Sequence, residues 1–180
     1  MDPEEEAVRT IAQLMVASAR TAPKGKGVDT IVAKILSGDE LSSLSDRMNE
    51  IGTRIGFSFF LRDAKNISAA SGCVLIGSRG TEHVGLNCGG CGFQTCGLMA
   101  DAYANCDRDT LFKGPVCIIR MADLGIAVGS AVKTAQIHNA DNRILFSAGV
   151  AALSLDLLPG CTTAYGIPLS ITGKNIFFDR

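Results

Sequence analysis

Three cysteines, Cys88, Cys91 and Cys96, lie in one short run of the chain, and two more follow at Cys106 and Cys117. Five of the seven cysteines therefore fall within residues 88–117. Thiolates are soft ligands for iron and zinc, and clustered cysteines in a reducing compartment are typical of metal sites rather than of disulfides. The spacing predicts a metal centre in this segment.

The first three cysteines suit an iron–sulfur cluster. A [4Fe–4S] cluster takes several thiolates from a tight loop and the last from a remote segment. The two glycines between Cys88 and Cys91 let the backbone curl so that both sulfur atoms point into one pocket. Cys96 lies where a helix is expected to begin, and that end of a helix favours a thiolate. We therefore predict that Cys88, Cys91 and Cys96 hold a [4Fe–4S] cluster.

Two cysteines compete for the fourth ligand position. Cys106 comes ten residues after Cys96, and along a straight helix this is about 15 Å, which is far for a compact cluster. Cys117 follows a loop with Gly114 and Pro115, and a loop can bring the chain back. The geometry favours Cys117 as the fourth ligand and leaves Cys106 as the alternative.

Other metal chemistry stays open. Zinc also binds four cysteines, but structural zinc sites usually pair two C-x2-C knuckles, and this chain has one. Plant-type two-iron clusters use the reverse order, C-x4-C-x2-C. The favoured function is a redox protein. The alternatives are a non-enzymatic module with a structural cluster or a four-cysteine zinc site, and a lyase whose cluster binds substrate at one iron.

Length and composition predict one ordinary folded domain. The 180 residues are 47% hydrophobic and 19% charged, with a net charge of −1 and no basic stripe for nucleic acid. The N-terminal run from Asp2 to Glu6 is acidic where an export signal would be basic. The most apolar stretch, residues 144–158, contains Asp156 and is too short to span a bilayer. We expect a cytoplasmic protein that binds neither nucleic acid nor membrane.

Hydrophobic periodicity predicts helices over residues 3–19, 29–37, 39–54 and 62–70, and a buried strand over residues 73–77. A helix of small residues is expected from a cap at Asp123 to about residue 138, followed by a turn at residues 141–143. A helix ending at residue 158 and a strand over residues 162–169 complete an α+β fold. We predict a single domain over residues 1–180, with residues 86–117 as an inserted iron–sulfur segment.

The run from Asn87 to Cys96 resembles the four-cysteine motif of the corrinoid iron–sulfur protein and related anaerobic electron carriers. That motif shares the C-x2-C-G-x3-C start and places its last cysteine near a proline. The resemblance carries over Cys88, Cys91 and Cys96 directly. It carries over Cys117 loosely, because the last spacing is longer here.

Over its whole length the chain resembles the DUF2148 family of proteins that contain a ferredoxin domain. The segments that carry this resemblance are the cysteine run and residues 19–27, 123–131, 141–143 and 173–180. The family implies an iron–sulfur cofactor and supplies no reaction. An electron-transfer protein would need a redox partner protein, and the small-residue helix is a candidate surface for a homo-oligomer.

The chain is also similar to the flavin-dependent nitroreductases in the order of its elements, from an N-terminal helix and an Ala-Pro turn to a late strand. This similarity implies nitroreductase-like helices around a small sheet, and FMN as a second cofactor. Arg20 and Lys24 would then meet the anionic group of the flavin, although the Arg-Arg-Ser phosphate motif of nitroreductases is absent. A solvated basic turn is the other interpretation. We assign no catalytic residue.

Overall fold

The apolar run near residues 73–77 forms the central strand β2 (Gly72–Ser78), and every residue of this strand is buried. β2 pairs with β1 (Ile31–Leu36) on one side and with β4 (Thr163–Ser170) on the other. The two-residue strand β3 (Asp141–Asn142) pairs with β4, so the order is β1-β2-β4-β3 and every pair is antiparallel. The computed structural model describes residues 2–178.

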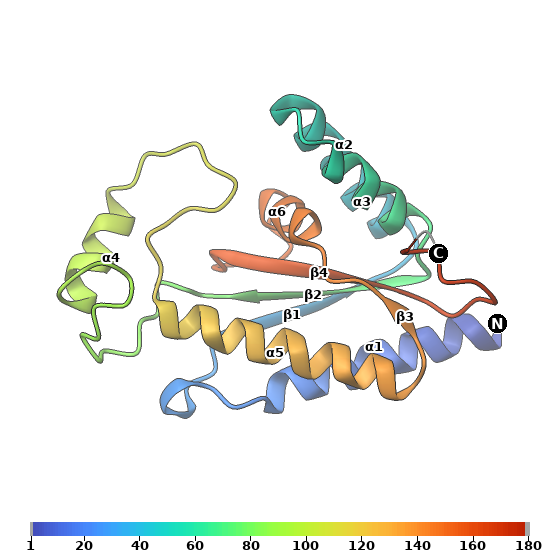
Figure 1. The fold of residues 1–180 in the computed structure, drawn as a ribbon, viewed down its shortest axis with the longest axis horizontal. Coiled ribbons are helices and arrows are strands. Elements are labelled where there is room, and N and C mark those ends of the chain that lie inside the picture. The colour runs from blue at the N-terminus through green and yellow to red at the C-terminus, as the bar shows by residue number, and fades with distance from the viewer. Residues whose placement is uncertain (1, 179–180) are drawn as a thin grey trace.

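Helices cover both faces of this sheet (Figure 1). α1 (Pro3–Thr21) and α5 (Ile118–Ile137) lie on one face, and α2 (Asp39–Ile55), α3 (Ser58–Ser68) and α6 (Phe146–Ser154) lie on the other. Side chains alternate along a strand, so Val74 and Ile76 join the core under α1 and α5. Cys73 and Leu75 join the core under α2, α3 and α6. The predicted α+β architecture of helices around a small sheet is confirmed.

Two glycines let α6 approach β4 closely. A Cβ atom on Gly149 of α6 would overlap the carbonyl of Ala164. A Cβ atom on Gly166 of β4 would lie 2.6 Å from Cβ of Ala148. Because neither position has room for a methyl group, these glycines set the spacing between the helix and the sheet.

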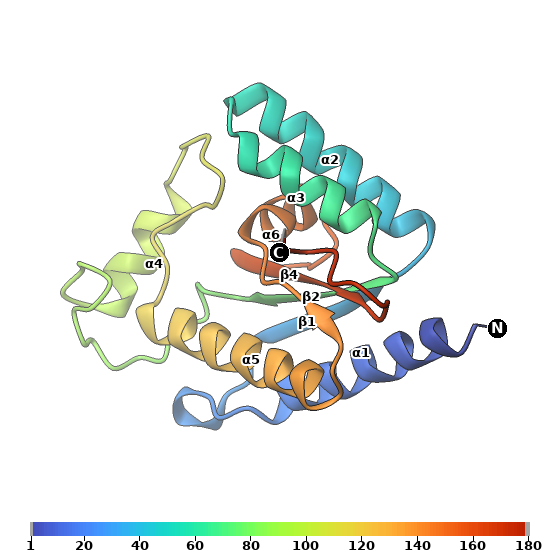
Figure 2. The ribbon, with the colours of Figure 1, turned by 45° about the vertical axis from the view of Figure 1, so that its right-hand side comes forward.

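Helix α4 (Cys96–Ala104) stands apart from both helical layers. With its flanking loops it lies at the end of the molecule opposite the N-terminus, in both views (Figure 2). Residues 79–95 lead into it from β2, and residues 105–117 lead from it to α5. This end carries the five clustered cysteines. Among residues 2–178, no helix has both the length and the hydropathy needed to cross a membrane.

Most predicted elements are present, and the predicted helix over residues 29–37 is wrong. Residues 31–36 form the edge strand β1. The apolar residues Ile31, Val32, Ile35 and Leu36 fit a helical period, but β-branched residues in so short a run also suit a strand. Pairing with β2 decides between them, since Ile35 lies opposite Val74 in the antiparallel register.

Four further boundaries differ from the prediction. The helix predicted to end at residue 158 ends at Ser154. α5 begins at Ile118, so Asp123 lies inside the helix and does not cap it. Residues 141–142 belong to β3 rather than to a turn, because they pair with Ser170 and Leu169. α3 begins at Ser58 rather than at residue 62. Of the C-terminal segment over residues 173–180, the last two residues lie outside the part that the structure describes.

Candidate metal centre

A tight turn shapes the cysteine loop ahead of α4. Gly89 and Gly92 have φ values of 72° and 87°, which favour glycine, and the Gly92 N–H donates to the Gly89 carbonyl at 2.9 Å. The Asn87 side-chain oxygen accepts a hydrogen bond from the Cys96 N–H at 2.9 Å. The two ends of the loop that carries Cys88 and Cys91 are therefore tied together.

Cys96 is the first residue of α4, as the sequence predicts. Thr95 caps this helix, since its hydroxyl accepts a hydrogen bond from the Leu98 N–H at 3.2 Å. A helix N-terminus presents free N–H groups and the positive end of the helix dipole. A thiolate ligand at Cys96 would meet favourable electrostatics there.

Cys117 occupies the same kind of position at the start of α5, where it is the N-cap residue. Its side chain is buried in a small apolar cluster with Val84 and Met99, and Cys91 packs against this cluster. A Cβ atom on Gly90 would lie 2.7 Å from the side chain of Ile118, so the cysteine loop presses on the residue after Cys117. The fold thus brings the loop of Cys91 against Cys117.

Cys106 follows the end of α4 and is half-buried. It lines a hollow of about 620 Å³ whose wall includes Phe93 of the cysteine loop and Pro115. Both candidates for the fourth ligand therefore lie at this end of the molecule. The preference for Cys117 over Cys106 stays a prediction.

The donor set fits a cluster by its chemistry. Five thiols lie in this segment, and thiolates are the ligands that iron–sulfur clusters and structural zinc share. Within residues 2–178, no three side chains of His, Cys, Asp or Glu lie close enough together to hold a metal ion. Gly89 and Gly92 have no other atom within 4 Å of a Cβ position, and both have positive φ values, so the turn between the cysteines is set by the backbone rather than by packing. His83, just before the loop, is exposed.

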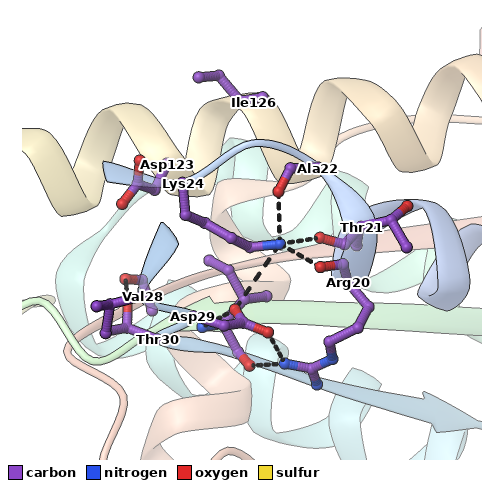
Figure 3. Close-up of polar contacts among 12 residues, drawn as sticks. Arg20, Thr21, Ala22, Lys24, Val28, Asp29, Thr30, Asp123 and Ile126 are labelled. Carbon is purple, nitrogen blue, oxygen red and sulfur yellow. Dashed lines mark hydrogen bonds and ion pairs between the residues drawn. The ribbon is translucent and has the colours of Figure 1, made fainter. Parts of the chain in front are cut away.

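Arg20 and Lys24, the predicted anion-binding residues, lie at the C-terminal end of α1 and in the loop after it (Figure 3). The Lys24 ammonium donates to the carbonyls of Ala19, Arg20 and Ala22, and its side chain is 4% exposed. An ammonium has three N–H donors, so these carbonyls use all of them. The binding of an FMN phosphate here stays a prediction, and a phosphate would have to displace these bonds.

Asp29 completes this group (Figure 3). It forms an ion pair with Arg20, and its other oxygen accepts from the Ile31 N–H at 3.0 Å. Burial acts to raise the pKa of Asp29, but these hydrogen bonds and the charges of Arg20 and Lys24 outweigh burial and lower the pKa below its ordinary value. The basic turn therefore carries its own counter-ion.

A buried polar network lies beside the cysteine loop, and none of the predictions from the sequence includes it. Asp123 accepts from the Gly25 N–H at 2.9 Å and from Arg120 at 3.0 Å. Arg120 also donates to the carbonyls of Glu82 at 2.7 Å and Val28 at 3.0 Å. An Arg and an Asp three positions apart in the otherwise apolar first half of α5 are the signal that could have indicated this pair.

Comparison with known proteins identifies relatives over the whole chain. The family model described as an uncharacterized protein containing a ferredoxin domain (DUF2148) matches residues 113–180, which include Cys117 and begin after Cys106. An uncharacterized protein of Archaeoglobus fulgidus is 40% identical over 179 residues, which cover 99% of this chain and 95% of that protein.

Solved structures share the fold at low identity. Nitroreductase A from Vibrio parahaemolyticus has a TM-score of 0.54 at 13% identity, over 97% of this chain and 61% of that one. A nitroreductase family protein from Clostridium novyi has a TM-score of 0.58 at 11% identity, over 91% of this chain and 74% of that one. A nitroreductase with bound FMN from Desulfitobacterium hafniense has a TM-score of 0.52 at 14% identity, over 97% of this chain and 81% of that one. The chain thus spans less than two thirds of the Vibrio enzyme.

Proposed function

Because this chain belongs to the DUF2148 family of proteins that contain a ferredoxin domain, we propose that it is a redox protein that carries one [4Fe–4S] cluster. Cys88, Cys91, Cys96 and Cys117 are the proposed ligands. The observation that carries the proposal is the contact of Cys91 and Cys117 with one apolar cluster, although α4 separates them along the chain. When bound, such a cluster accepts and donates single electrons.

The surrounding residues supply the environment that the ligands need. α4 begins at Cys96 and α5 directly after Cys117, so two helix N-termini favour negative charge at the proposed site. Val84 and Met99 are buried beside Cys117 and limit its contact with water. Solvent exposure and hydrogen bonds to sulfur are the features by which a protein tunes the reduction potential of a cluster.

The test is anaerobic purification followed by analysis of iron, sulfide and zinc, with an EPR spectrum after reduction by dithionite. We expect about four iron atoms and about four sulfides per chain, and an EPR signal that appears on reduction. Zinc without iron contradicts the proposal and supports the alternative, a non-enzymatic module with a structural zinc site of four cysteines.

We further propose that a redox partner protein docks at this end of the molecule. Cys88 is exposed, and Leu86 and Leu98 are 53% and 50% exposed beside the cysteine loop. Exposed apolar side chains around a redox centre suit a transient protein contact.

A reducing cytoplasm, in which thiols stay free for a metal, is the proposed location. Self-association through the exposed face of α5, where Ile137 is 65% exposed, is also proposed, with analytical ultracentrifugation as its test.

The nitroreductase-like fold favours a second form of the redox proposal, a flavin-assisted oxidoreductase. FMN would then lie near Arg20 and Lys24, and Lys24 would have to release the carbonyls of Ala19, Arg20 and Ala22. The test is acid release of a yellow chromophore with flavin absorption from the purified protein. If the purified protein contains the cluster but releases no flavin, the flavin-assisted form of the proposal is contradicted and the proposed function is that of an electron carrier.

A further inference from the structure

A hollow of about 380 Å³ lies between α2, α6, α4 and the loop over residues 109–113. Its size is at the small end of the range for ligand sites in proteins, about 300–1,000 Å³. The loop that forms one wall is the segment that leads from α4 to Cys117. The hollow therefore lies between the cysteine segment and the remainder of the domain.

Positive charge dominates the lining of this hollow. Arg47 and Arg54 come from α2 and Lys113 from the loop, whereas Asp109 is the one carboxylate among the lining residues. Arg47 is paired with Glu50 at 2.9 Å. Within residues 2–178, neither Arg54 nor Lys113 forms an ion pair. The planar guanidinium of arginine matches a carboxylate with two parallel hydrogen bonds.

Apolar and aromatic side chains form the other walls. Tyr103 and Phe112 contribute rings, and Leu153 of α6 contributes an aliphatic surface. The Lys113 ammonium lies 4.7 Å from the centre of the Tyr103 ring. The Phe112 ring packs edge-on against Phe146 of α6, with 5.0 Å between ring centres, and so anchors the loop. A flat apolar ligand body would find aromatic partners here.

The side chain of Cys161, which also lines the hollow, carries no negative charge that would repel an anion. Burial raises the pKa of Cys161 to about 11, with a smaller opposing effect from Arg79. The side chain is therefore an uncharged thiol at neutral pH. Arg54 and Lys113 together outweigh the one lining carboxylate, Asp109, so the hollow is suited to a ligand with an acidic group.

We propose that this hollow binds a small aromatic carboxylate, with its ring between Tyr103 and Leu153 and its carboxylate at Arg54 and Lys113. Binding requires no electron transfer. The proposal of a carboxylate site is therefore independent of the proposed redox function. An experiment that contradicts one of the two proposals does not contradict the other.

The test uses the full chain, purified anaerobically with its native metal content. 2-Naphthoate and the uncharged 2-naphthalenemethanol are titrated into it in a calorimeter. We expect 2-naphthoate to bind at least about tenfold more tightly than the alcohol, since charge-assisted hydrogen bonds discriminate between them. The double variant Arg54→Gln, Lys113→Gln is expected to lose that preference. Lys133→Gln, which removes an exposed cation of α5 outside the hollow, is the matched control and retains it.

Three results overturn the proposal. They are equal affinity for the acid and the alcohol, an equal loss of binding in Lys133→Gln, and absence of binding by both probes. Because all the substituted side chains are exposed, each variant is expected to fold. Unchanged metal content and circular dichroism check this point. If the double variant does not fold, Arg54→Gln alone carries the same comparison with Lys133→Gln.

Discussion

Arg120 and Asp123 form an ion pair at 3.0 Å in which the two side chains are 2% and 4% exposed. The pair lies on the first turns of α5, directly after Cys117. Through it, α5 is bonded both to the backbone of Glu82, ahead of the cysteine loop, and to the backbone of Gly25, after α1. One buried pair therefore connects the segment ahead of the cysteine loop with the basic turn after α1.

Loss of one partner of this pair is expected to destabilise the fold strongly. Asp123→Ala leaves the Arg120 charge buried without its counter-ion, and such a change costs about 3–5 kcal/mol. Glu50→Gln breaks the exposed pair with Arg47, which should cost less than about 1 kcal/mol. Urea unfolding followed by circular dichroism measures both. Equal losses for the two variants would show that the buried pair contributes no more than a surface pair.

Replacing two helix glycines by alanine is expected to change the stability of the protein in opposite directions. Gly149→Ala places a methyl group against the Ala164 carbonyl, and overpacking of this kind costs about 1–3 kcal/mol or more. Gly125→Ala, in the interior of α5, meets no atom within 4 Å and should stabilise the protein by about 0.5–1 kcal/mol. Thermal unfolding separates the two variants. A stabilising Gly149→Ala would mean that α6 can move away from β4.

The elements that the sequence predicted well are those with long, regular periods. Val8, Ile11 and Met15 of α1 recur at helical spacing, and all three are buried against the sheet. The strand β1 is too short to show a period. It lies between helical layers, so its apolar residues do not alternate with polar ones and its pairing with β2 decides its structure.

The features of the site that depend on neighbouring residues could be predicted from the sequence. The features that depend on contacts between residues far apart in the sequence could not. The turn between Cys88 and Cys91 and the helix start at Cys96 follow from neighbouring residues. Asp is a common helix cap, so the sequence predicts a cap at Asp123, which lies inside α5 instead. Its partner Gly25 lies 98 positions away, and no local pattern reveals that contact.

The lowered pKa of Asp29 predicts a loss of stability in acid. A carboxylate with a lowered pKa stabilises the fold above its unfolded-state pKa of about 3.9, and this contribution is lost as the pH falls through the lowered folded value. Asp29→Asn should therefore be less stable than the parent at pH 7, and the difference should shrink below about pH 4. Asp46→Asn, at an exposed position of α2, is the control. A difference between parent and Asp29→Asn that is constant from pH 7 to pH 3 contradicts the assignment.

Thiol labelling should separate Cys161 from Cys88. Burial raises the pKa of Cys161 to about 11, so little reactive thiolate is present at pH 8, whereas Cys88 is exposed. After removal of bound metal, iodoacetamide at pH 8 is expected to modify Cys88 well before Cys161, as measured by mass spectrometry of peptides. Labelling of Cys161 should accelerate as the pH rises toward 11. In the control, the unfolded protein in urea, Cys88 and Cys161 should be modified at the same rate. Equal rates of modification in the folded protein, without urea, contradict the prediction.

The choice of fourth ligand predicts different metal contents for two single substitutions. Cys117 is buried in the cluster against which Cys91 packs, whereas Cys106 lies after the end of α4, outside this cluster, and lines a hollow that shares Phe93 with it. Cys117→Ser should therefore lower the iron content and shift the EPR signal of the reduced protein, and Cys106→Ser should leave both near the parent values. Cys73→Ser, in the sheet away from this segment, controls for the effect of losing a buried thiol. Because loss of a ligand from a [4Fe–4S] cluster can leave a three-iron cluster, iron and sulfide are counted together with the spectrum. Loss of iron in Cys106→Ser with a full cluster in Cys117→Ser reverses the assignment.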